Sequence, residues 1–128
     1  MFSHIMIGTS DRERAKTFYD AVLGTLGVKP GSVDQHRVFW RTPGGVFSVT
    51  RPINGEPATV ANGGTIGFVC QSAEQADAWH AAGLANGGSS CEDPPGVRGA
   101  GGPVQMYIAY LRDPDGNKIC GLYRMPKS

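Results

Sequence analysis

Short apolar runs alternate with polar and glycine-rich segments along the chain, and the first of them predicts a strand followed by a helix. Residues 3–8 are apolar and β-branched, as in a buried strand. Ser10 and Glu13 then have the spacing of a capping box, which predicts that a helix starts at this serine. Apolar residues continue at helical spacing at Ala15, Phe18, Val22 and Leu23. Gly24 follows as a residue that tolerates the left-handed end of a helix.

The next two segments predict a β-hairpin. Residues 35–41 and 46–51 alternate between apolar and polar side chains, and the turn-forming sequence Thr42-Pro43-Gly44-Gly45 separates them. The first half of the chain therefore has the order strand, helix, hairpin.

The same order returns in the second half of the chain. Residues 65–70 predict a strand, and Ser72 with Gln75 forms a second capping box. The helical stripe consists of Ala76, Trp79 and Ala82, closed by Gly83. After a long loop, residues 104–112 and 117–123 predict two strands around the turn Asp113-Pro114-Asp115-Gly116.

We interpret this repetition as an internal duplication of a βαβββ unit, with modules at about residues 1–55 and 63–128. Each module is too small to bury its own sheet. The prediction is therefore one α+β domain over residues 1–128, in which the two modules combine.

Strand alternation separates an apolar face from a polar one. If Ile5 and Ile7 face the helices, His4 lies on the opposite face. By the same argument that opposite face also carries Ser48, Thr65 and Cys120. A sheet face with small and polar side chains suits a concave surface around a ligand.

Composition excludes several function classes. The net charge of +1 offers no field for nucleic acid. There is no long apolar run and no signal-peptide pattern, which predicts a cytoplasmic protein without a membrane span. The 3 cysteines lack a CxxC spacing, so we expect reduced thiols.

The sequence resembles the vicinal oxygen chelate superfamily, which includes glyoxalase I, the fosfomycin and bleomycin resistance proteins and the extradiol dioxygenases. The matching segments are His4-Ile5, the helix from Ser10-Asp11 to Leu23-Gly24, Gly64-Thr65-Ile66-Gly67-Phe68, and Asp113 to Ile119. The resemblance implies paired βαβββ modules whose curled mixed sheet forms a cup, with the helices on its outer face. It also implies a homodimer and a small-molecule ligand.

Enzymes of this superfamily hold a divalent metal with His and Glu side chains from the strands. Carried over by position, the four ligand positions are His4, Ser48, Thr65 and Cys120. Only His4 keeps the type of a metal ligand, and hydroxyls are poor ligands for such metals. We therefore expect no metal cofactor, with His4 as the remaining weak candidate ligand.

Two readings of the polar face stay open. In one, His4 and Cys120 are catalytic, with the imidazolium lowering the pKa of the thiol. In the other, His4 is a hydrogen-bonded wall residue and Cys120 a small buried hydrophobe. The predicted substrate-binding residues are Ser48, Thr65, Trp40, Arg98 and Tyr107. The loop 83–103, which carries Arg98, is a candidate lid over the cup.

The chain could therefore be a glyoxalase-like protein related to lactoylglutathione lyase, with a degenerate metal site. It could equally be a metal-free binding protein of the bleomycin-resistance type. Whether it is an enzyme is left open, because members of the superfamily share the cup and differ in chemistry.

Overall fold

The structure is a computed structural model that describes residues 1–126, so the last two residues of the second predicted module lie outside it. The first half contains β1 (His4–Gly8), α1 (Arg12–Gly24), β2 (Ser32–Asp34), β3 (Arg37–Thr42) and β4 (Gly45–Thr50). The second half contains β5 (Ile66–Val69), α2 (Ala73–Ala85), β6 (Ser89–Ser90), β7 (Gly96–Arg98), β8 (Met106–Arg112) and β9 (Lys118–Arg124). The predicted α+β class is confirmed.

The two halves build separate sheets with the same strand order. The first sheet runs β1-β4-β3-β2, and the second runs β5-β9-β8-β6, with β7 also paired to β8. In each sheet the first strand lies parallel to the last, and the remaining pairs are antiparallel. This matches the repeated unit expected from the sequence, whereas the duplication itself and the cup stay predictions.

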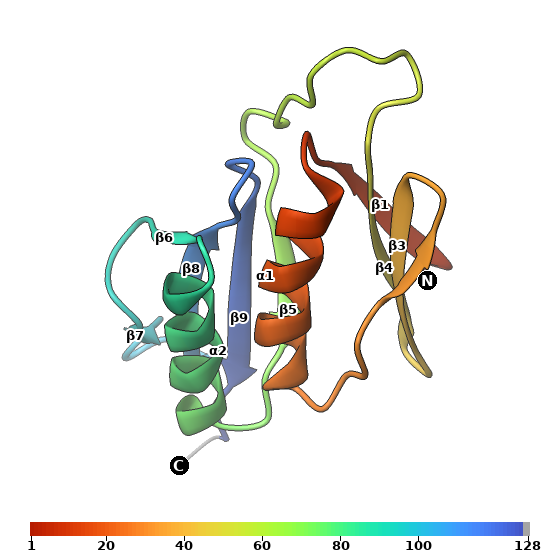
Figure 1. Cartoon of the computed structure of the whole chain (residues 1–128). Helices are drawn as coiled ribbons and strands as arrows, with labels where there is room; N and C mark the ends of the chain where they lie inside the picture. The colour runs from red at the N-terminus through yellow and green to blue at the C-terminus, as the bar shows by residue number, and fades with distance from the viewer. Residues whose placement is uncertain (127–128) are drawn as a thin grey trace.

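In Figure 1 α1 lies between the two sheets, and α2 covers the second sheet at β8 and β9. α1 contacts β3 and β4, α2 contacts β8 and β9, and the two helices contact each other. The core between helices and sheets is aromatic and aliphatic; its largest fully buried side chains include Trp40, Trp79, Tyr19, Phe18, Leu111 and Ile119. Burial of this apolar face is the main stabilising contribution expected for the fold.

The helix starts differ in one respect from the prediction. The N-cap of α1 is Asp11, whose carboxylate accepts from the Arg14 amide at 3.1 Å. The hydroxyl of Ser10 instead accepts from the Ala58 amide, so the first capping box is not formed. Asp11 is favoured over Ser10 as the N-cap because its carboxylate also interacts favourably with the helix dipole.

The second helix starts as predicted. Ser72 accepts from the Gln75 amide at 3.0 Å, and the side chain of Gln75 accepts from the amide of Gln71 rather than from that of Ser72. The second bond of the capping box is thus moved one residue toward the N-terminus, from the Ser72 amide to the Gln71 amide.

The Asp113 to Asn117 turn joins the two halves. Asp115 accepts from the Thr9 hydroxyl at 2.6 Å, from the Ser10 amide at 2.8 Å and from Arg14 at 3.0 Å. Asn117 donates to the Gly8 carbonyl at 3.1 Å. The motif that carries much of the family resemblance therefore holds the second hairpin against the start of α1.

Candidate ligand-binding faces

We call the surface of each sheet that points away from the helices its open face. In the first sheet Ile5 pairs with Phe47, which belongs to the core, whereas Met6 pairs with Ser48. His4 and Ser48 therefore lie on the open face, as alternation predicts.

The two residues differ in what they can offer a ligand. His4 is exposed, and its Nδ1 lies 2.8 Å from the Ser3 hydroxyl. Ser48 is fully buried and donates to the Ile5 carbonyl at 2.8 Å. The Ser48 hydroxyl is thus occupied by the backbone, and His4 is the accessible polar group of the pair.

In the second sheet the matching positions are Thr65 and Cys120. Thr65 is exposed and directly precedes β5. Cys120 pairs with Gly67, where an added Cβ would lie 3.2 Å from the cysteine Sγ. Ile119 lies in the core, so Cys120 is on the open face.

The Cys120 thiol is disfavoured as a thiolate. Burial raises its pKa above the ordinary value, an effect that nearby Lys118 partly offsets and Glu92 and Cys91 reinforce. His4 is not among the causes of the shift. Burial therefore favours the protonated thiol and works against the predicted His4–Cys120 nucleophile, which stays a prediction.

Tyr110 and Lys118 are neighbours of Cys120 on the open face, and alternation along β9 already places Lys118 there. Tyr110 is its partner on β8, and the Lys118 ammonium lies 5.0 Å from the centroid of the Tyr110 ring. Lys118 also forms an ion pair with Glu92. Tyr110 is indicated as a neighbour only once the register of β8 against β9 is known.

Trp40 and Tyr107 lie on the helix-facing side of their strands and not on the open face, although Trp40 also lines the groove between β1 and β5 described below, and their role in substrate binding stays a prediction. Trp40 pairs with Phe47, is 1% exposed, and donates from Nε1 to Asp20 at 2.9 Å. Tyr107 donates to Asp77 of α2 at 2.7 Å. Both residues occupy the strand positions that face the helices.

Arg98 is on the open-face side of β7 but serves its own loop. Its guanidinium donates to the carbonyls of Asp93 and Pro94 at 3.2 and 3.1 Å. Its partner on β8 is Met106. The loop 83–103 is thus not a free segment, because β6 and β7 pair with β8.

A groove of about 440 Å³ separates β1 from β5, the edge strands of the two sheets. His4 lines it from the first half of the chain, and Ile66 and Gly67 line it from the second. The structure therefore brings His4 and the strand after Thr65 to one hollow. Ser48 and Cys120 are outside its lining.

The four positions do not fit a divalent metal. Together they offer one imidazole, two hydroxyls and one thiol, and no carboxylate. Within residues 1–126 no group of three or more His, Cys, Asp or Glu side chains is arranged to hold a metal ion. Catalytic metal sites of the kind that the resemblance implies need three or more such ligands.

Comparison with known proteins now defines the class. The Glyoxalase/Bleomycin resistance protein/Dioxygenase superfamily matches residues 1–120, and the chain belongs to this superfamily. No curated protein matched significantly. In the described part of the chain, no helix is long and apolar enough to cross a membrane.

Solved structures show the same fold. A glyoxalase/bleomycin resistance protein from Albidiferax ferrireducens T118 is 62% identical, with a TM-score of 0.92, and the match covers 97% of this chain and 99% of that one. A glyoxalase-related enzyme from Fulvimarina pelagi is 19% identical, with a TM-score of 0.72 and coverage of 96% and 87%. A lactoylglutathione lyase from Agrobacterium tumefaciens is 19% identical, with a TM-score of 0.65 and coverage of 96% and 92%.

Proposed function

We propose that the protein is a glyoxalase-like binding protein that takes a small molecule on its open faces without a divalent metal. The observation that carries this proposal is the donor set at the four family positions. The Ser48 hydroxyl is already bonded to the backbone, and burial keeps the Cys120 thiol protonated. Binding needs only shape and a few polar anchors, whereas metal-assisted chemistry needs ligands that these positions lack.

The charge of the open faces indicates the kind of ligand. By strand register these faces carry six cationic residues, namely Arg37, Arg41, Arg98, Arg112, Lys118 and Arg124. The one acidic residue on the strands of these faces is Asp34, within the part of the chain that the structure describes. The protein as a whole is almost neutral, so this asymmetry favours a ligand with an anionic group.

Apolar contacts complete the proposed site. Met6 and Val69 are exposed on the open faces, and Tyr110 presents its ring beside Lys118. A ligand with a carboxylate and a compact apolar or aromatic body matches this mixture. A covalent role for Cys120 is less favoured, because forming its thiolate works against burial.

The test is a thermal-shift screen of small aromatic and aliphatic carboxylates in the presence of EDTA. We expect at least one compound to raise the melting temperature of the wild type in EDTA. The affinity of His4→Ala and of Lys118→Gln for this compound should be about tenfold lower or more, a loss of roughly 1.4 kcal/mol of binding free energy. Lys29→Gln is the matched control, because Lys29 is exposed and lies outside the strands. Stabilisation that requires added divalent metal, or equal weakening in Lys29→Gln, would overturn the proposal.

A further inference from the structure

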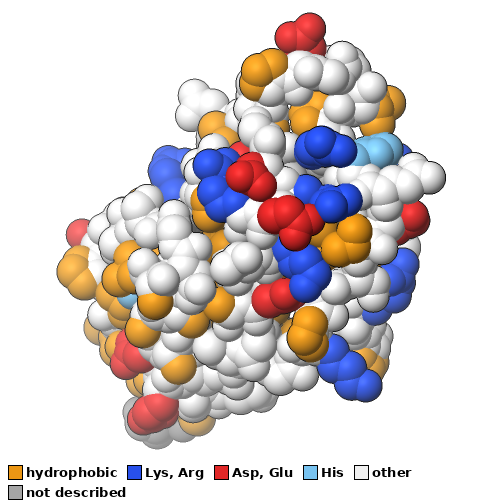
Figure 2. Space-filling view, viewed as in Figure 1, with side chains coloured by type: hydrophobic (Ala, Val, Ile, Leu, Met, Phe, Trp, Pro, Cys, Tyr) orange, Lys and Arg blue, Asp and Glu red, His pale blue; other side chains and the backbone are white. Residues whose placement is uncertain are grey.

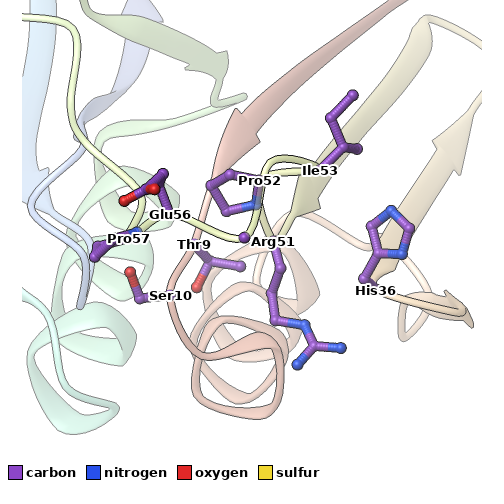
Figure 3. Close-up of a pocket in the computed structure, with 9 residues that line it drawn as sticks. Thr9, Ser10, His36, Arg51, Pro52, Ile53, Glu56 and Pro57 are labelled. Carbon is purple, nitrogen blue, oxygen red and sulfur yellow. The ribbon is translucent and has the colours of Figure 1, made fainter.

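A second hollow lies away from the open faces, at the segment that links the two halves. It has a volume of about 590 Å³, and its lining consists of Thr9, Ser10, His36, Arg51, Pro52, Ile53, Gly55, Glu56 and Pro57. We call it the linker pocket (Figure 3). In Figure 1 this segment arches over the N-terminal end of α1.

His36 and Arg51 are cross-strand neighbours in the linker pocket. The Arg51 amide donates to the His36 carbonyl at 3.0 Å, which extends the β3–β4 ladder one pair beyond Arg37 and Thr50. Side chains of such a pair point to the same side of a sheet, with Cβ atoms roughly 5 Å apart. Alternation puts this pair on the helix-covered side, opposite the open face.

The guanidinium of Arg51 has no partner among the described residues, in ion pairs or hydrogen bonds. Among the nearby carboxylates, Glu13 pairs with Arg12 and Asp115 with Arg14, whereas Asp11 and Glu56 line the same hollows as Arg51 without an ion pair to it. Arg51 also borders a smaller hollow at the first turn of α1. Arg51 therefore lies where two hollows meet and forms no ion pair there among the described residues.

The other polar groups of the linker pocket are also available as donors. Nε2 of His36 is buried without a hydrogen-bond partner, a situation that folded proteins seldom leave unexplained. The Ser10 oxygen accepts from the Ala58 amide, which leaves its hydroxyl hydrogen free to donate. These three groups together form a donor set.

We propose that the linker pocket binds a small molecule through one oxyanion group, a carboxylate or a phosphate. The planar fork of Arg51 suits two oxygens of such a group, and the Ser10 hydroxyl can donate to it from the same hollow. The buried Nε2 of His36 donates to it only once the ring turns this nitrogen toward the hollow. Figure 2 shows Lys and Arg side chains gathered on this face over the start of α1, with acidic side chains among them.

The remaining lining restricts the rest of the ligand. Pro52, Ile53 and Pro57 give the pocket an apolar wall. Glu56 lies across the pocket from Arg51, as Figure 3 shows, and disfavours a second negative charge at that end. The ligand class is therefore a compact molecule with an apolar body and a single anionic group.

The experiment is an NMR titration of the full chain with three probes: isobutyrate, inorganic phosphate and the neutral isobutyramide. We expect saturable shifts at residues 51–57 with isobutyrate or phosphate and none with isobutyramide. Arg51→Gln should weaken this binding about tenfold or more. The affinity of Arg51→Lys for the probe should lie between those of Arg51→Gln and the wild type, because lysine keeps the positive charge but lacks the planar guanidinium with its paired donors.

Arg41→Gln is the matched control. It removes a cation from the open face, so the linker-pocket shifts should titrate as in the wild type, and His4→Ala should also leave them unchanged. The proposal is overturned if no saturable shifts occur at residues 51–57, if isobutyramide binds equally well, or if Arg41→Gln weakens the binding as much as Arg51→Gln. The proposed open-face function can fail in its own screen without affecting this result.

Discussion

The phenol of Tyr19 is fully buried and donates to Oδ2 of Asp113 at 2.6 Å. Burial raises its pKa well above the usual value of about 10, and the neighbouring Asp113 carboxylate raises it further. The folded state therefore favours the neutral phenol. Since the folded-state pKa is the higher one, this contribution to stability is complete below pH 10 and is lost as the pH rises toward the folded-state pKa.

We predict that Tyr19→Phe lowers the free energy of unfolding by about 2 kcal/mol at pH 7, because one donor to the buried carboxylate is lost. The wild type should lose stability steadily above pH 10, and the variant should lose less. Urea unfolding followed by circular dichroism at pH 7 to 11 measures both effects. A variant whose stability falls as steeply as that of the wild type would show that Tyr19 does not cause the alkaline loss.

The thiols allow a second prediction at this scale. Burial raises the pKa of Cys70 to about 11 and also raises that of Cys120. Because the thiolate is the reactive form, iodoacetamide at pH 7.5 should modify both at least about tenfold more slowly than in the unfolded chain. Mass spectrometry of timed samples measures the rates. Fast modification of Cys120 that disappears in His4→Ala would restore the catalytic pair predicted from the sequence.

At the scale of elements, the Asp113 to Asn117 turn connects the second hairpin to α1. Asp115 accepts from Thr9, Ser10 and Arg14, and its side chain is 6% exposed. A nearly buried carboxylate with three donors is costly to neutralise, because its donors then lose a charged acceptor.

Asp115→Asn should therefore lower the free energy of unfolding by about 2 kcal/mol or more. Asp93→Asn is the matched control and should change stability little, because Asp93 is exposed and its side chain forms no ion pair or hydrogen bond among the described residues. Thermal unfolding of the two variants under the same conditions makes the comparison. Equal melting temperatures would mean that the turn does not hold the two halves together.

The elements that could be predicted are those determined by residues close together in the sequence. The helices and the strands β1, β3, β4, β5, β8 and β9 follow from local periodicity, and the face of His4 and Cys120 follows from alternation. The N-cap of α1 could not be predicted from nearby residues, because the Ser10 hydroxyl accepts a hydrogen bond from the amide of Ala58, which is distant in the sequence. That Trp40 and Tyr107 face the helices could not be read from the strands alone, because their partners, Asp20 and Asp77, belong to helices that the strand pattern does not reveal.

The linker pocket could not be predicted from the sequence either, because it also depends on contacts between residues far apart in the chain. Arg51 and His36 meet only through the β3–β4 register, and residues 52–57 contain no regular pattern. A cation at the end of a predicted strand has no neighbour until that register is fixed.

At the scale of the whole molecule, the open faces belong to two sheets whose edge strands β1 and β5 flank a groove. Exposed apolar side chains, including Phe2, Met6 and Val69, lie on or near these strands. Unpaired edges and apolar patches of this kind are commonly covered by another chain.

We therefore predict a homodimer. Sedimentation velocity at micromolar concentration should give a species of twice the 13.5 kDa chain mass. Met6→Lys should shift the equilibrium toward the monomer, because it puts a charge on the open face, and Ile53→Lys, exposed in the linker segment, should not. A wild type that sediments only as a monomer would contradict the prediction.

The central claim is that this member of the superfamily binds its ligand without a divalent metal. Its most direct test is elemental analysis of the protein after incubation with nickel, zinc, iron and manganese and removal of the unbound ions. The account predicts metal contents far below one ion per chain, and no further drop in His4→Ala. A stoichiometric metal that is lost in His4→Ala would contradict it.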